Sequence, residues 1–78
     1  MSIEQRMEMI FDDLMPGEDT PVRQRTLDQT AAWDSMCQLN LVIAIEQEFG
    51  ISMTDAETSS LESYDAAISI VERHGVGD

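Results

Sequence analysis

The residues best suited to chemistry in this chain stand just ahead of its most apolar stretch. Asp34 and Ser35 come immediately before a run, Leu39–Phe49, in which apolar residues recur at helical spacing. A serine in the first turn of a helix has its oxygen facing outward, and the unpaired N–H groups of that turn favour an attached anion. We therefore expect Ser35 to be well placed to carry a phosphodiester.

Other reactive side chains are scarce. His74 is the only histidine and lies near the C-terminus, so a hydrolase built on Ser35 would depend on that single base. We expect His74 to be a surface residue in a last helical turn instead. Cys37 is the only cysteine, which excludes an internal disulfide and a cysteine metal site, and we expect a partly exposed structural thiol. We predict no catalytic residue and no metal site, so the chain is not expected to be an enzyme.

The charge of the chain limits the classes of partner that it can bind. Sixteen acidic residues stand against four arginines and no lysine, for a formal net charge of −12. Such a chain is unsuited to binding nucleic acid and to binding anionic membrane surfaces. It contains no signal-peptide pattern and no stretch long enough to span a bilayer, so we expect a cytoplasmic protein. The acidity favours partners with basic surfaces, or marks an ordinary solvated surface.

Periodicity and capping residues predict a single domain, 1–78, with four helices. The helices are expected at about 3–15, 35–49, 55–61 and 64–73. Their predicted start and stop residues are Ser2, Asp34, Thr54 and Ser63 as N-caps, and Gly50 and Gly75 as terminators. The predicted fold is all-α: an irregular four-helix bundle with a long loop between the first two helices and a short third helix.

Two expectations concern the interior. The helix at 35–49 is apolar around much of its circumference, so we expect its apolar residues to be buried: Met36, Leu39, Leu41, Val42, Ile43, Ile45 and Phe49. The loop that follows Pro16 shows no periodicity, and loops of this length are usually functional or anchored. Val22 and Leu27 are the predicted anchors.

The run from Trp33 to Gly50 closely resembles the second helix of acyl carrier proteins. Asp34-Ser35-Met36 stands at the helix start, with Glu46 and Phe49 in register. The match continues without an apparent gap through residues 51–55 and on to 63–68, so it covers most of the chain. Asp-Ser-Met alone is a weak signal; its register with the later residues, in an acidic chain of this length, makes it strong.

The resemblance implies a modified serine. A phosphopantetheinyl transferase would move 4′-phosphopantetheine from coenzyme A onto Ser35 and would recognise Asp34. The thiol of the arm would hold acyl or aminoacyl thioesters for a loading enzyme and a downstream synthase. The carrier itself would be a monomer that catalyses nothing.

The resemblance also implies a docking surface on the second and third helices. Its expected members are Trp33, Met36, Cys37, Gln38, Asn40, Glu46, Gln47, Glu48, Asp55 and Glu57. Trp33 has two interpretations, core or docking contact, with core slightly favoured. Four of the acids (Glu46, Glu48, Asp55 and Glu57) also suggest a weak cation region.

Departures from the fatty-acid carriers bear on the pathway. Ala32 stands where many of them have glycine, and the second helix is neutral at Cys37, Gln38, Asn40 and Gln47 where they tend to be acidic. This resembles free-standing carriers of polyketide, nonribosomal peptide or other specialised pathways. An aminoacyl or D-alanyl carrier is one alternative, and a non-carrier acidic helical interaction module is another. The sequence leaves the cargo open.

Overall fold

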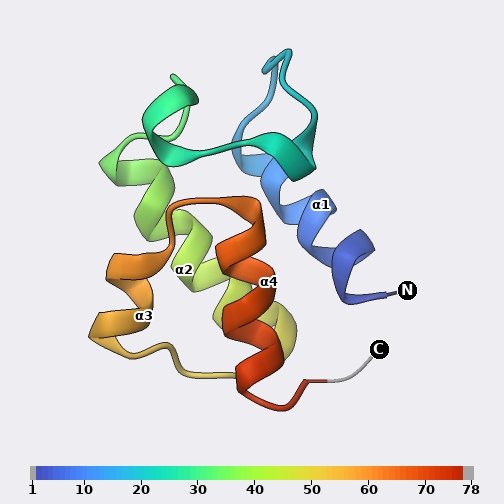
Figure 1. The fold of residues 1–78 in the computed structure, drawn as a ribbon, viewed down its shortest axis with the longest axis vertical. Helices are drawn as coiled ribbons and strands as arrows, with labels where there is room; N and C mark the ends of the chain where they lie inside the picture. Colours follow the sequence, from blue (N-terminus) through green and yellow to red (C-terminus); the bar gives the residue numbers. More distant parts are fainter. Residues whose placement is uncertain (1, 77–78) are drawn as a thin grey trace.

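The fold is all-α, as predicted. The computed structural model describes residues 2–76, which form four α-helices and no β-strand (Figure 1). The helices are α1 (Ile3–Leu14), α2 (Ser35–Phe49), α3 (Asp55–Ser60) and α4 (Tyr64–Arg73). The predicted bounds are exact for α2 and α4 and one residue too long at the ends of α1 and α3. Residues 1, 77 and 78 of the predicted domain lie outside the described residues.

The helix ends are set by the predicted capping residues. The Ser2 hydroxyl accepts a hydrogen bond from the Gln5 N–H, and the Gln5 side chain accepts one from the Ser2 N–H. Thr54 and Glu57 form the same reciprocal capping box at the start of α3. Gly50 ends α2 at φ 65°, a left-handed conformation that favours glycine. These local contacts explain why the helix bounds could be predicted.

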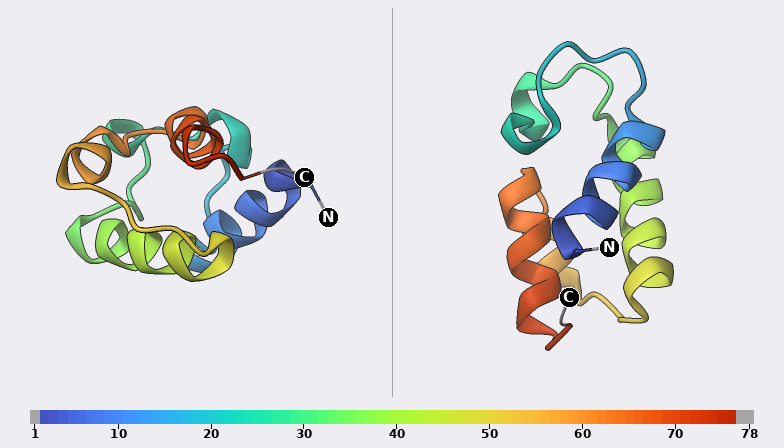
Figure 2. Two further views of the ribbon diagram at one scale, coloured as in Figure 1. Left: turned by 90° about the horizontal axis from the view of Figure 1, so that it is seen from below. Right: turned by 90° about the vertical axis from the view of Figure 1, so that its right-hand side faces the viewer.

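The helices surround one hydrophobic core. Figure 2 shows α2 and α4 on opposite sides of the bundle, with α1 and α3 on the other two. Phe11 lies at the centre and packs edge-on against Trp33 and Tyr64, with ring centroids 5.3 Å and 5.5 Å away. The Tyr64 hydroxyl donates to the Glu4 carbonyl at 3.1 Å, so α4 is also tied to α1 by a hydrogen bond.

The orientation of α2 differs from the prediction. Met36, Leu39 and Ile43 were expected in the core, but their exposed fractions are 67%, 56% and 44%. The buried residues of the helix recur every four positions instead: Cys37, Leu41, Ile45 and Phe49. The prediction was right for Leu41, Ile45 and Phe49. It was wrong for the three exposed residues, because the helix carries apolar residues on all sides while a core this small contacts only one stripe.

The loop between α1 and α2 is ordered by two short 3₁₀ helices, η1 (Val22–Gln24) and η2 (Leu27–Gln29). Between them, Thr26 forms an isolated antiparallel bridge with Ser63, immediately before α4. The bridge attaches the middle of the loop to the body of the bundle.

The side chains that anchor this loop are only partly those predicted. Val22 is half-buried and packs against the core, whereas Leu27 is exposed and the prediction for it was wrong. Arg25 and Thr30 are buried in its place. The Arg25 guanidinium is held by the loop itself, because its Nε donates to the Thr20 carbonyl at 2.9 Å. Within residues 2–76, no helix has both the length and the apolar composition that crossing a bilayer requires.

Candidate functional site

Ser35 is the first residue of α2, and its side chain is exposed. Asp34 fixes the start of the helix: its Oδ1 accepts from the Cys37 N–H at 2.9 Å, and its carbonyl accepts from the Gln38 N–H at 2.9 Å. In the described part of the chain, no residue is hydrogen-bonded to the Ser35 hydroxyl. The hydroxyl therefore faces solvent at the positive end of the helix dipole.

A groove runs beside Ser35 between the start of α2 and the end of α3. Its volume is about 490 Å³. The residues that line this Ser35 groove are Leu27, Trp33, Asp34, Ser35, Gln38, Thr58 and Ser59. The lining is more apolar than polar, so a chain attached to Ser35 would meet apolar surface as well as hydroxyl, amide and carboxylate groups there.

Trp33 and Gln38 are structural residues rather than free docking side chains. Trp33 is 4% exposed, which settles its two interpretations in favour of the core. Its Nε1 donates to the Gln38 Oε1 at 2.6 Å, and the Gln38 Nε2 donates to the carbonyls of Thr58 and Leu61 at 3.0 and 3.1 Å. Gln38 thus joins α2 to the C-terminal end of α3.

Cys37 is buried, contrary to the expectation of a partly exposed thiol. Its position two residues after Ser35 turns it toward α1, where its Sγ lies 3.8 Å from the Leu14 carbonyl. Burial, and secondarily the charge of Asp34, raises the pKa of the Cys37 thiol. Cys37 is therefore buried away from any docking partner, and Trp33 offers only the small exposed part of its side chain that borders the Ser35 groove.

Three of the four acids expected to form a docking or cation region (Glu46, Glu48 and Glu57) have separate structural partners. The Glu46 Oε2 accepts from the Met53 N–H at 2.9 Å, and the Glu48 Oε2 pairs with the Arg6 Nε at 2.8 Å. Asp55 is exposed in the first turn of α3. Among residues 2–76, no group of three or more acidic, histidine or cysteine side chains is arranged to hold a metal ion. The prediction of a cation region here was wrong.

Glu57 serves two structural roles at the start of α3. It accepts from the Thr54 N–H, and its Oε1 lies 2.9 Å from the His74 Nε2 at the end of α4. The hydrogen bond from Thr54, followed by the one from His74, lowers the pKa of the Glu57 carboxyl. Figure 1 shows the end of α4, where the His74–Glu57 contact lies, and the start of α2 at opposite ends of the bundle.

The exposed surface of α2 next to Ser35 is uncharged and combines three apolar side chains with two amides. We call it the α2 face, and it consists of Met36, Leu39, Asn40, Ile43 and Gln47. These residues are spaced i, i+3, i+4, i+7 and i+11, so they share one side of the helix. All five are exposed and none is charged, although the whole chain carries −12.

Leu39 and Ile43 were missed as surface residues because the sequence assigned them to the core. A signal was present: the four-residue stripe from Cys37 to Phe49 already supplies a complete buried side. Met36, Leu39 and Ile43 therefore lie on the other side, while Val42 is half-buried at the edge of the core. Met36, Asn40 and Gln47, all predicted docking residues, are exposed on this side.

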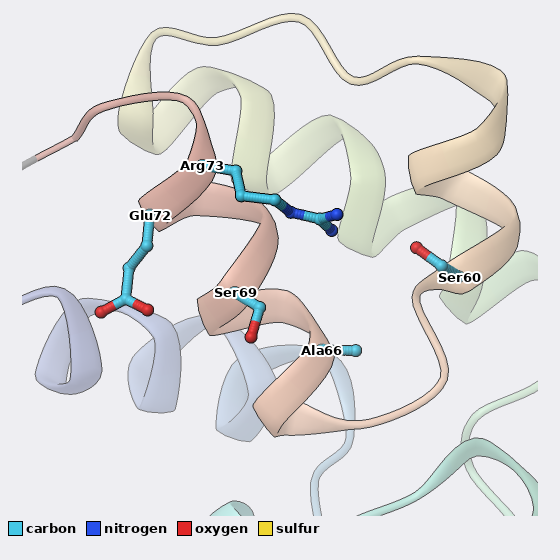
Figure 3. Close-up of a pocket in the computed structure, with 5 residues that line it drawn as sticks. All are labelled: Ser60, Ala66, Ser69, Glu72 and Arg73. Carbon is cyan, nitrogen blue, oxygen red and sulfur yellow. The ribbon is translucent and has the colours of Figure 1, made fainter.

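A second open groove lies between α3 and α4 (Figure 3) and has a volume of about 620 Å³. It is lined by Ser60, Ala66, Ser69, Glu72 and Arg73. The Arg73 side chain extends toward α3 in this view. Its lining contains no histidine, so neither Ser60 nor Ser69 has an imidazole base beside it in this groove.

No model of a known protein family matches this chain. The resemblance to acyl carrier proteins rests on the sequence from Trp33 to Gly50 and its continuation through residues 51–55 and 63–68.

Proposed function

We propose that this chain is a carrier protein whose Ser35 bears 4′-phosphopantetheine. The supporting observation is an exposed serine hydroxyl, free of hydrogen bonds to described residues, at the first position of a long helix. The Ser35 and Met36 N–H groups lie in the first turn, where the helix dipole favours a phosphodiester, while the Cys37 N–H is bound by Asp34. The site therefore fits the group.

The modification is a group transfer from coenzyme A by a phosphopantetheinyl transferase. A bond forms between the Ser35 oxygen and the phosphorus that carries the pantetheine. The bond from that phosphorus to the adenosine bisphosphate breaks, and the serine proton passes to a base of the transferase. The attached arm supplies a thiol that holds acyl or aminoacyl groups as thioesters. Tethering raises the effective concentration of the cargo for each enzyme that it meets.

Asp34 has two compatible roles. Its Oδ1 caps α2, which positions Ser35, and its side chain is exposed. The second carboxylate oxygen is available to the transferase or to a metal ion held with coenzyme A in that enzyme.

The α2 face is the surface that a loading enzyme and a downstream synthase would contact. Its exposed side chains Met36, Leu39 and Ile43 replace Trp33 and Cys37 as the apolar anchors, since the latter two are buried. Charges at the rim of an interface mainly set the association rate, whereas a few central anchors carry affinity. A neutral face favours a partner with an apolar recess over one with a strongly basic patch. This supports a dedicated pathway of polyketide, nonribosomal peptide or aminoacyl type.

Mass spectrometry tests the carrier function directly. Incubation with coenzyme A and a promiscuous transferase should add one arm to the wild type. Ser35→Ala should abolish the addition and keep the helical circular dichroism spectrum. Ser59→Ala is the matched control, because Ser59 is also exposed and lines the same groove; it should be modified like the wild type.

Two outcomes would contradict the proposal. An arm that still attaches to Ser35→Ala would assign the site elsewhere. An unmodified wild type would remove the carrier function and favour the alternative of an acidic interaction module.

A further inference from the structure

The boundary between α2 and α3 is closed by polar contacts next to Ser35. Gln38 lies three residues after Ser35, about one helical turn, so both side chains border the same groove. Its amide makes three hydrogen bonds: one from the Trp33 indole and two to the carbonyls of Thr58 and Leu61. We call these three contacts the Gln38 link.

The groups joined by the Gln38 link need their partners. The Thr58 and Leu61 carbonyls belong to the last turn of α3 and to its C-cap, where helical N–H donors run out. The Trp33 indole is almost fully buried, and a buried indole N–H requires an acceptor. The Thr58 carbonyl also accepts from the Leu61 N–H at 3.3 Å and would keep that bond. An acyl chain that displaced Gln38 would leave the Leu61 carbonyl and the Trp33 indole without the hydrogen bonds that Gln38 makes to them, and buried polar groups without partners are strongly unfavourable.

The interior behind the Gln38 link is packed with apolar side chains. Leu41 and Ile45 of α2, Leu61, and Ile70 of α4 are at most 1% exposed. A long chain would have to break the polar contacts and also displace these side chains. Well-packed interiors resist such insertion.

We propose that Gln38 determines cargo specificity by keeping the bound acyl group outside the helical core. The carrier then takes short, polar acyl or aminoacyl groups and does not enclose long aliphatic chains. This inference rests on the proposed function at Ser35. Its physical basis is that the penalty for leaving a cargo in water grows with each methylene group, and is small only for short or polar cargo.

The test compares two cargoes on the same protein. A promiscuous transferase loads acetyl or octanoyl pantetheine from the corresponding acyl-coenzyme A, and mass spectrometry verifies each product. In the wild type, the two forms should melt within about 1 °C of each other. Their amide NMR shifts at Leu41 and Ile45, and the Trp33 indole shift, should be the same.

Gln38→Leu removes the link, and the octanoyl form of this variant should melt about 4 °C or more above its acetyl form, with shifted core amides. Gln24→Leu is the matched control, because Gln24 is an exposed glutamine that lies outside both the Ser35 groove and the α2 face; it should behave like the wild type.

A wild-type octanoyl form that is stabilised, or whose Leu41 and Ile45 amides shift, would overturn the role of Gln38. That comparison can overturn the proposal even if Gln38→Leu does not fold. If the transferase adds no arm, the proposed function fails separately. An octyl chain is then attached by a disulfide to Ser35→Cys in a Cys37→Ala background. Unshifted core amides in that derivative support the exclusion by Gln38, and shifted ones overturn it.

Discussion

Arg6 in α1 holds Glu48 near the end of α2 by two contacts. The Arg6 Nε lies 2.8 Å from the Glu48 Oε2, and the Arg6 Nη2 donates to the Glu48 carbonyl at 2.6 Å. The same guanidinium lies over the Phe49 ring, 4.4 Å from its centroid. Glu48, expected as a docking acid, therefore has a structural role: it fixes the end of α2 against α1.

Arg6→Met should lower the stability of the fold. A partly exposed ion pair and a cation–π contact together are worth about 1 kcal/mol. For a domain of this size, that corresponds to a fall in melting temperature of about 4–8 °C. Thermal melts of Arg6→Met, Glu48→Gln and the double variant should show coupling between the two residues. Arg73→Met, at an exposed arginine of α4, is the control. An equal fall in melting temperature in that variant would show that the Arg6 contacts stabilise the fold no more than an exposed arginine does.

Acid should weaken the contact between α3 and α4 through Glu57. The folded pKa of this carboxyl lies below its ordinary value of 4.5, owing to the Thr54 N–H and His74. A lowered pKa contributes stability that is present above the unfolded value and is lost as the pH falls through the folded value. The free energy of unfolding should therefore drop more steeply below pH 4.5 in the wild type than in Glu57→Gln. The control is Glu72→Gln, at an exposed glutamate of α4. Parallel curves for wild type and Glu57→Gln would contradict the prediction.

Salt should stabilise the protein without a specific divalent effect. At a net charge of −12, self-repulsion opposes folding, and salt screens it. Sodium chloride should therefore raise the melting temperature. Magnesium at the same ionic strength should add little, because Glu46, Glu48 and Glu57 already have partners within the fold. A saturable stabilisation by magnesium at low concentration would show that a cation site exists after all.

Added acids on the α2 face should change its partner preference. In Asn40→Glu/Gln47→Glu, the association with fatty-acid synthase enzymes that present a basic patch should become faster and more dependent on salt. The control Gln24→Glu/Gln29→Glu gives the same change in net charge on the loop. Cys37 is left unchanged because an acid there would be buried. Equal association rates and salt dependence for both variants and the wild type would refute the idea that a neutral face selects the partner.

Features that depend on neighbouring residues could be predicted from the sequence. The N-caps Ser2, Asp34 and Thr54 each bind an N–H three residues further on, so their roles follow from spacing alone. Gly50 ends α2 for an equally local reason. Because Asp34 is the N-cap, Ser35 is the first residue of α2, and it is exposed there.

Features that depend on distant partners could not be predicted. Gln38 donates to two backbone carbonyls, one in α3 and one at its C-cap. Every residue has a backbone carbonyl, so the sequence does not show which ones a distant side chain will bind. Leu39 and Ile43 are exposed because the core is too small to cover every apolar residue of α2. Arg25 is buried against the loop backbone, a position that its charge argues against.

The bridge between Thr26 and Ser63 makes the long loop a cooperative part of the fold. The Leu27 N–H donates to the Glu62 carbonyl at 2.8 Å, and the Tyr64 N–H donates to the Arg25 carbonyl at 3.2 Å. One opening motion breaks both bonds, so these two amides should exchange their hydrogens with solvent at matching rates. The segment that leads to Ser35 is thereby coupled to the start of α4. A change that loosens either segment should speed the hydrogen exchange of both amides.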